Sequence, residues 1–174
     1  MTKASEKKTE TGQLDLTITR VIDAPRALMW EAWTTPEHLK RWWTPAPWTT
    51  PECRIDLRPG GEFYTLMRGP DGAEHAVNGC YLDIVPQERI VFTDVLLAGW
   101  RPAATPYPHG PCGPCFTAII TFEDLKGGTK YTARALHKDD ADREIHREMG
   151  FELGWNAALD QLVDLVRSMR GNAK

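Results

Sequence analysis

The chain has 174 residues, of which 41% are hydrophobic and 26% are charged, and its formal net charge at pH 7 is −3. This size and composition are typical of a single globular domain, and a slightly acidic chain without Lys or Arg runs argues against nucleic acid as a partner. The sequence contains neither a secretory signal nor an apolar run near the ~20 residues of a membrane span, and four Cys are too few for a disulfide scaffold, so we expect a cytoplasmic protein with reduced thiols.

The N-terminal part of the chain predicts a tail, a strand and two short helices. Residues 1–12 are polar and aperiodic, which indicates a disordered tail ahead of one domain over residues 13–171. Apolar and polar side chains alternate over residues 14–22, as in a half-buried strand. The segment "PRALMWEAW" then predicts one short helix, and residues 35–43, which begin Thr-Pro-Glu, predict a second.

Residues 52–137 show a β pattern interrupted by short turns, which predicts an antiparallel meander. The exception is the span 96–114, where five Pro and three Gly predict a long loop of the kind that is usually functional or mobile. The predicted strands are "CRIDL", "EFYTLMR", "HAVNGCYLDIV", "RIVFTDVLL", "FTAIITFEDL" and "TKYTARALH".

A long amphipathic helix is predicted over residues 141–169, because apolar residues recur there at spacings of three and four. Its start lies in the charge run "HKDDADREIHRE", which we interpret as a cap and a solvated face. Gly150 and Gly154 would each cost about 1 kcal/mol relative to Ala inside a helix. Close packing is the explanation that we favour for them, and the close approach of a ligand is the alternative.

This order of elements predicts an α+β fold, in which a curved antiparallel sheet of about seven strands wraps around a long C-terminal helix, with two short helices after the first strand. A curved sheet covered by one helix leaves a hollow between them. The two short helices and the long loop are placed to close the ends of that hollow. The sequence therefore predicts a ligand cavity.

Several segments, in this order and spacing, resemble a known family: "ITRVIDAPRALMWEAWTTPEHLKRWWTP", "DLRPGGEF", "GCYLDIVPQERIVFTD" and "GWNAALDQL". They are similar to the helix-grip proteins of the START-like (SRPBCC) superfamily, and more closely to its bacterial branch similar to the C-terminal domain of the activator of heat-shock protein 90 ATPase. The resemblance covers residues 14–169 and implies a helix-grip fold with a deep hydrophobic pocket. Members of the superfamily bind lipids, polyketides, plant hormones or other small apolar molecules, some are cyclases or aromatases, and the namesake stimulates a chaperone.

The resemblance supplies no shared set of catalytic residues, so none is assigned here, and no cofactor is expected. The function that we expect is binding of a small hydrophobic or amphipathic molecule. The alternative is a cyclase- or hydrolase-like enzyme that uses Asp94, His137 or Tyr81 as acid or base. A weaker alternative, by family analogy alone, is a co-regulator of a chaperone ATPase.

Candidate cavity residues follow from strand parity and from the apolar stripe of the long helix. For most of them plain core packing is the alternative, but the polar Asp94 and His137 would be costly among apolar groups unless they had partners. The predicted set is Phe63, Met67, Val77, Tyr81, Phe92, Asp94, Tyr131, His137, Met149, Leu153 and Trp155.

The chain contains seven Trp, and such a number indicates either a large core or a cavity wall. Trp43, Trp48 and Trp100 are candidates for a lid over the pocket, with packing against the sheet as the alternative. The same Trp-rich region and the sheet edge could also support a homodimer.

The motif Cys112-Gly113-Pro114-Cys115 has the spacing of a thioredoxin redox centre, and His109 stands three residues before it. A redox thiolate needs the N-terminus of a helix, whereas a strand is predicted after Cys115. His109, Cys112 and Cys115 could instead hold a metal, although a closed zinc site wants four ligands. Free loop thiols or a facultative disulfide are the remaining readings.

Overall fold

The structure is a computed structural model that describes residues 12–104 and 113–172. Nearly all of the predicted tail over residues 1–12 lies outside the described residues, as do residues 105–112 of the predicted loop. The elements follow in chain order: β1 (Asp15–Ile22), α1 (Arg26–Thr34), α2 (Pro36–Leu39), β2 (Thr49–Ile55), β3 (Glu62–Arg68), β4 (Glu74–Val85), β5 (Arg89–Thr93), β6 (Leu96–Leu97), the 3-10 helix η1 (Ala98–Trp100), β7 (Arg101–Pro102), β8 (Thr117–Leu125), β9 (Gly128–Leu136), α3 (Asp140–Glu148) and α4 (Phe151–Asn172).

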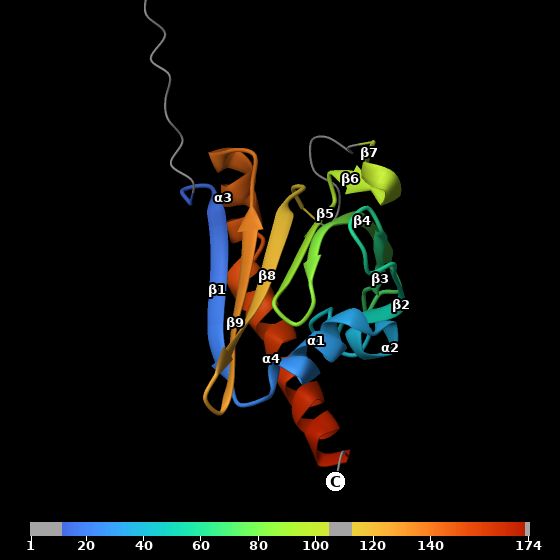
Figure 1. Ribbon diagram of the computed structural model, residues 1–174. Coiled ribbons are helices and arrows are strands. Elements are labelled where there is room, and N and C mark those ends of the chain that lie inside the picture. Colours follow the sequence, from blue (N-terminus) through green and yellow to red (C-terminus); the bar gives the residue numbers. More distant parts are fainter. Residues whose placement is uncertain (1–11, 105–112, 173–174) are drawn as a thin grey trace, which may run out of the picture.

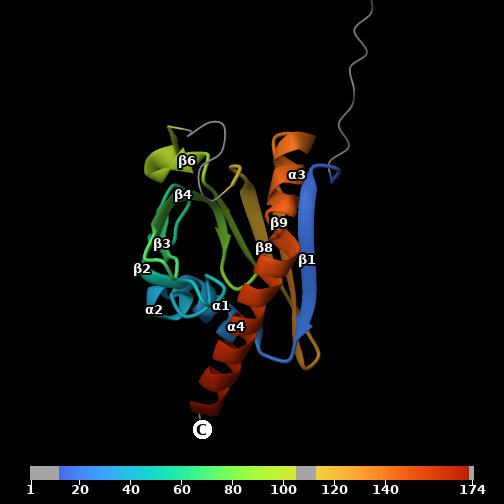
Figure 2. The ribbon, with the colours of Figure 1, turned by 180° about the vertical axis from the view of Figure 1, so that it is seen from behind.

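Seven strands form one antiparallel sheet in the order β1-β9-β8-β5-β4-β3-β2. The chain therefore runs as a meander from β2 to β9, and β1 completes the sheet beside β9. The sheet curves around α4, which crosses its inner face, while α1 and α2 lie beside the lower part of the sheet (Figures 1 and 2). The predicted α+β architecture of curved sheet, two short helices and long C-terminal helix is confirmed.

Buried and half-buried side chains alternate along the strands, so the sheet has one buried face. In β9, Tyr131, Ala133 and Ala135 are at most 3% exposed, whereas the residues between them are only half-buried. These side chains share one core cluster with Leu162 and Val166 of α4. Burying a Leu or Val side chain contributes ~1.5–3 kcal/mol, so the helix stripe and the strand alternation together account for the docking of α4.

The C-terminal segment differs from the prediction, because it forms two helices instead of one. Helix α3 ends at Glu148, and Gly150 then has a positive φ of 92°, which breaks the helix before α4 begins at Phe151. The side chain of Asp139 accepts a hydrogen bond from the backbone N–H of Asp142 and caps α3.

Two further segments differ from the prediction. Helix α2 is a single turn, and the chain beyond Leu39 continues in turns up to the two Pro that follow. Within the predicted loop, β6 and β7 pair as a short hairpin around η1. The Trp100 ring at its tip packs on the backbone of Gly60, where a Cβ atom would come within 2.7 Å of the ring.

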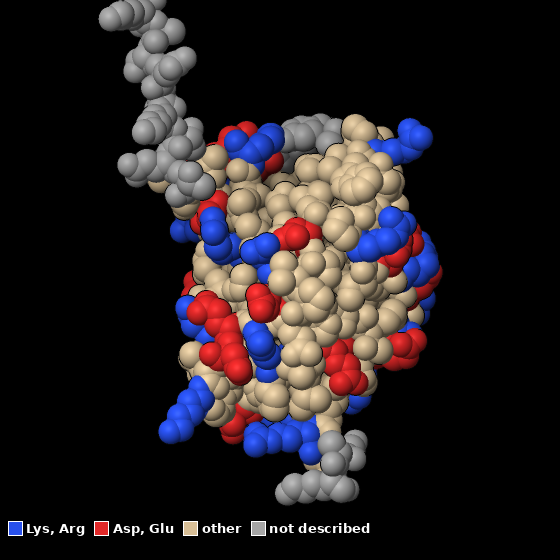
Figure 3. Space-filling view, in the orientation of Figure 1, with Lys and Arg blue, Asp and Glu red and all other residues tan. Residues whose placement is uncertain are grey.

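None of the described helices combines the length and the apolar composition needed to cross a bilayer. On the face shown in Figure 3, Lys and Arg side chains are interspersed with Asp and Glu, so this face carries no large patch of one charge among the described residues.

Candidate functional site

A cavity of about 360 Å³ lies between the inner face of the sheet, the α1–α2 region and the start of α4. Most of its wall is aromatic or aliphatic, and four of its residues carry ionisable or hydroxyl groups: Thr93, Asp94, Tyr131 and His146. It reaches the surface at Met149, whose side chain is 54% exposed. The aromatic side chains of the wall are Trp33, Trp42, Trp43, Phe63, Phe92, Phe116, Tyr131, Phe151 and Trp155.

The aromatic wall is a connected cluster. Trp33 of α1 lies 4.8 Å from Trp42, 5.6 Å from Trp43 and 6.3 Å from Phe92, measured between ring centroids. The Trp42 N–H donates to the carbonyl of Ala32, which fixes that ring. The Trp33 N–H is enclosed and has no hydrogen-bond partner among the described residues. These separations are within the range of favourable aromatic contacts, so the rings pack as one part of the cavity wall.

The structure places most of the predicted cavity residues around this space, from four strands and from both sides of the α3–α4 break. Met149 is the C-terminal cap of α3, and Asp94 directly follows β5. The predicted residues that line the cavity are Phe63, Met67, Val77, Phe92, Asp94, Tyr131, Met149 and Trp155.

Three predicted cavity residues lie elsewhere. Tyr81 is 1% exposed and packs in the core, 5.3 Å from the Phe63 ring, next to a register shift in β4. Leu153 is 81% exposed, because it is two residues from Trp155 and two residues correspond to about 200° around a helix. His137 is buried behind the cavity wall, against His146.

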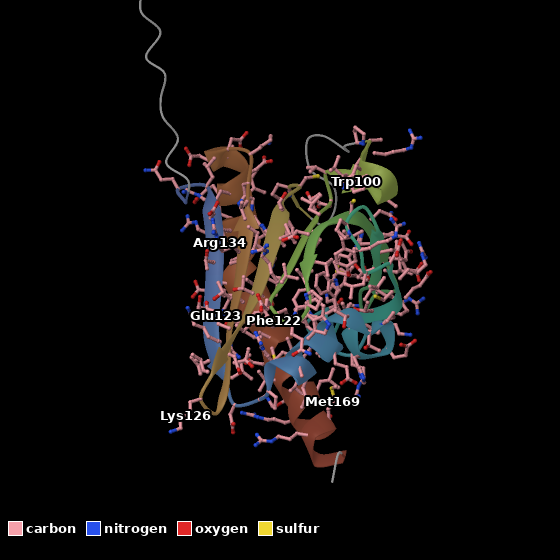
Figure 4. The ribbon with its side chains drawn as sticks, viewed as in Figure 1. Trp100, Phe122, Glu123, Lys126, Arg134 and Met169 are labelled. Carbon is pink, nitrogen blue, oxygen red and sulfur yellow. The ribbon has the colours of Figure 1, made fainter. Side chains whose placement is uncertain are left out.

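Of the three candidate lid residues, one lines the cavity and two lie outside it. Trp43 lines the cavity and contacts Phe63 at 5.3 Å. Trp48 is 37% exposed and stacks on His75, outside the cavity. Trp100 is 55% exposed and lies in the η1 region, at the opposite end of the molecule from α1 and α2 (Figure 4). Only Trp43 is therefore placed to act on the cavity.

A carboxyl group enters one side of the cavity. Asp94 is half-buried, and its Oδ1 accepts a hydrogen bond of 2.9 Å from the backbone N–H of Phe116. Burial raises the pKa of Asp94 to about 6, and the Phe116 N–H opposes that rise. Burial and the nearby Asp94 charge raise the pKa of the Cys115 thiol to about 11, so this thiol stays protonated near neutral pH.

A pair of buried His lies on the other side of Phe116. His137 Nδ1 is 2.9 Å from the carbonyl oxygen of Leu14, and His137 Nε2 is 2.8 Å from His146 Nδ1. His146 is 8% exposed, and burial followed by the proximity of His137 lowers its pKa to about 4. The His146 ring, which packs on Phe116 at 5.0 Å and on Phe151 at 5.1 Å, is therefore neutral near pH 7.

The sequence reasoning missed His146 and Phe116 as cavity residues. Its charged neighbours in the sequence instead predict a solvated helix face for His146. The available signal was the spacing of Asp142 and His146, which are four residues apart on α3 and are both buried.

The predicted metal ligands are only partly described. His109 and Cys112 lie outside the described residues, and Cys115 is a free thiol. Over residues 12–104 and 113–172, no group of three or more His, Cys, Asp or Glu side chains could hold a metal ion.

Several solved structures of other proteins are similar to this chain in sequence and in fold. A Nitrosomonas europaea crystal structure is 38% identical, covers 92% of this chain and 99% of its own, and has a TM-score of 0.85. A Mycobacterium smegmatis crystal structure is 27% identical over 87% of this chain and 90% of its own, with a TM-score of 0.71. The solution structure of an AHSA1-like protein from Aeromonas hydrophila, 21% identical over 89% of this chain and 93% of its own with a TM-score of 0.65, shares the fold.

No curated protein matches the sequence significantly. The family model described as "Activator of Hsp90 ATPase homolog 1-like protein" matches residues 23–167, which is most of the chain and includes every described element from α1 through most of α4. The resemblance found in the sequence is therefore confirmed, and the chain belongs to the family of Activator of Hsp90 ATPase homolog 1-like proteins.

Proposed function

We propose that this protein binds a small, largely apolar molecule in the cavity between the sheet and the C-terminal helices. The observation that carries the proposal is a space of about 360 Å³ with an aromatic wall and few polar groups. Small-molecule sites have this form, with volumes of roughly 300–1,000 Å³ and a small number of placed polar groups. The volume is at the lower end of that range, which favours a ligand with one or two rings or a short chain.

Binding is favoured over catalysis by the positions of the candidate acids and bases. Of Asp94, His137 and Tyr81, only Asp94 lines the cavity, while the other two are enclosed. An enzyme would need an acid or base within hydrogen-bond reach of the reacting atoms. Asp94 and His146 remain available for that role, so recovery of a chemically altered ligand after incubation would favour the enzyme.

The experiment begins with native mass spectrometry of the purified protein, which reports any co-purified organic molecule, any metal and the assembly state together. Calorimetric titration with naphthalene then measures binding of a neutral apolar probe with two rings. We expect saturable binding of one naphthalene per chain, with the negative heat-capacity change that accompanies burial of apolar surface.

A matched pair of variants locates the binding. Ala158 lines the cavity and is 8% exposed, whereas its neighbour Ala157 does not line it. Ala158→Leu should fill part of the cavity and weaken naphthalene binding at least tenfold, and Ala157→Leu should leave it nearly unchanged. Equal affinities in the two variants, or no naphthalene binding to the unmodified protein, would rule out this cavity as the site.

A further inference from the structure

We infer that the polar end of the ligand is a hydrogen-bond donor without negative charge, such as a hydroxyl or an amine, so that the cavity rejects carboxylates and phosphates. This inference rests on the proposed binding function and specifies its ligand. It follows from the tautomer of one buried His, from the position of one carboxyl group, and from the absence of Lys and Arg among the described residues of the wall.

The first step is the tautomer of the His pair. A backbone carbonyl can only accept, so His137 Nδ1, at 2.9 Å from the carbonyl oxygen of Leu14, must carry the hydrogen. In the neutral ring, His137 Nε2 is then an acceptor, and it receives the hydrogen of His146 Nδ1 over 2.8 Å. The chain of hydrogen bonds therefore leaves His146 Nε2 without a hydrogen and with a free lone pair.

The second step is the direction of that lone pair. His146 lines the cavity, and because its Nδ1 is taken up by His137, Nε2 is the ring nitrogen that remains for a ligand. Over residues 12–104 and 113–172, Nε2 has no hydrogen-bond partner, and it keeps some accessible surface. The rings of Phe116, Phe151 and Trp155 hold the imidazole in place, with centroids 5.0, 5.1 and 6.1 Å away. A fixed neutral acceptor thus faces the ligand.

The third step is the charge of the cavity. Asp94 lines the same cavity and is joined to the backbone of Phe116, whose ring packs on His146, so the two acceptors flank one residue. None of the described residues in the wall is Lys or Arg. A ligand anion would be desolvated beside the Asp94 carboxylate without a counter-charge, which is strongly unfavourable. The Tyr131 hydroxyl, whose pKa burial raises, can donate or accept a hydrogen bond, but it is uncharged and supplies no counter-charge for a ligand anion beside Asp94.

The experiment compares four probes with the same bicyclic body by calorimetric titration at pH 7.5: naphthalene, 2-naphthol, 2-naphthylmethylamine and 2-naphthoate. One net hydrogen bond contributes about 0.5–1.5 kcal/mol, or roughly 2- to 10-fold in affinity. We expect 2-naphthol and the amine to bind at least about threefold tighter than naphthalene, and 2-naphthoate to bind more weakly than naphthalene.

Two variants assign the preference to its residues. His146→Phe should abolish the advantage of 2-naphthol over naphthalene, measured as the ratio of the two affinities within that variant. Ala157→Leu, outside the cavity wall, should keep that ratio as in the unmodified protein. Asp94→Asn should reduce the affinity for the amine and raise the affinity for 2-naphthoate, with 2-naphthol changed least. Nitrogen NMR of the unmodified protein should show an unprotonated Nε2 in His146, a readout that does not depend on the folding of any variant.

The outcomes separate this inference from the proposed function. If 2-naphthoate binds as tightly as 2-naphthol, or if Nε2 of His146 carries the hydrogen, the inference is overturned while cavity binding stands. If none of the four probes binds, including naphthalene, the proposed function itself fails.

Discussion

The carboxyl group of Asp94 is held in a partly apolar site, and this has a consequence for stability. The pKa of Asp94 is raised to about 6, so the folded protein binds its proton more tightly than the unfolded chain does. Above pH 6 the ionised group therefore destabilises the fold, and below pH 3.8, the ordinary pKa of Asp, this effect disappears. Asn keeps an oxygen that can accept from the Phe116 N–H but carries no charge.

We therefore expect Asp94→Asn to raise the free energy of unfolding at pH 8 by up to about 3 kcal/mol, with the gain fading towards pH 4. Urea unfolding at the two pH values measures it. Asp164→Asn is the control, because that side chain is 79% exposed on α4 and should change stability little at either pH. A gain that is independent of pH would show that the charge of Asp94 is not its cause.

The pKa of His146 is shifted in the opposite sense. It is lowered to about 4 from an ordinary value of 6.5, so between these values the unfolded chain binds a proton that the folded protein excludes. Stability contributed by the neutral His146 is present above pH 6.5 and is lost as the pH falls towards 4. Protonation of Asp94 raises the stability as the pH falls through much of the same interval. The loss of stability due to His146 is therefore best measured in a variant that lacks the Asp94 charge.

In an Asp94→Asn background, the free energy of unfolding should fall by about 3 kcal/mol between pH 6.5 and pH 4. Adding His146→Phe should flatten that slope, although the variant loses the hydrogen bond to His137 at every pH. Urea midpoints across the pH series give the slope directly. An equally steep slope in the double variant would assign the acid sensitivity to another group.

At this scale, prediction from the sequence succeeded where a local period determines the direction of a side chain. Alternation along β3 and β5 was sufficient to place Phe63, Met67 and Phe92 on the inner face. The position of His146 could not be obtained in this way, because its partner His137 lies on another segment and the contact depends on how α3 docks at the end of β9.

The break between α3 and α4 determines which side chains face the cavity. Periodicity alone could not reveal it, because the apolar spacing continues across the break and Gly150 looks like any glycine within a helix. The structure also removes the packing explanation for both glycines, because a Cβ atom built at Gly150 or Gly154 would meet nothing within 4 Å. The two positions differ in backbone conformation, since only Gly150 has a positive φ.

This difference predicts opposite effects of the same substitution. Gly154→Ala should stabilise the protein by roughly 0.5–1 kcal/mol, because Ala is the better helix former and its methyl group has space. Gly150→Ala should destabilise it by roughly 1–2 kcal/mol, because φ of 92° is strained for a residue with a Cβ atom. Thermal unfolding of the ligand-free variants, side by side, measures the sign, and equal signs would contradict the helix break.

The whole molecule was the most predictable level, apart from the cavity itself. The order of strand, short helices, meander and terminal helix follows from periodicity and turn chemistry, and antiparallel neighbours in the chain become neighbours in the sheet. The volume of the cavity could not be obtained from these patterns. The volume depends on the curvature of the sheet and on the final positions of rings such as Trp33 and Phe92, which a sequence pattern does not specify.

Because residues from β1 to α4 share the cavity wall, a bound ligand should stabilise the molecule as a unit. A ligand that binds only the folded state stabilises it by about 2.7 kcal/mol at one hundred times its Kd. For a domain of this size, that corresponds to an increase in Tm of roughly 5–10 °C. We expect 2-naphthol at that excess to produce such a shift in the unmodified protein, as followed by circular dichroism.

Two Ala→Leu variants test whether this increase in Tm comes from binding in the cavity. Ala158→Leu fills part of the space that the ligand would occupy, and a tenfold loss of affinity leaves a stabilisation of about 1.4 kcal/mol at the same concentration. Its Tm should therefore respond to 2-naphthol by at most about half the shift of the unmodified protein. Ala157→Leu, one position along the same helix but outside the cavity wall, should respond like the unmodified protein. If both variants shift alike, the probe stabilises the fold from another surface, and the coupling between cavity and fold would be disproved.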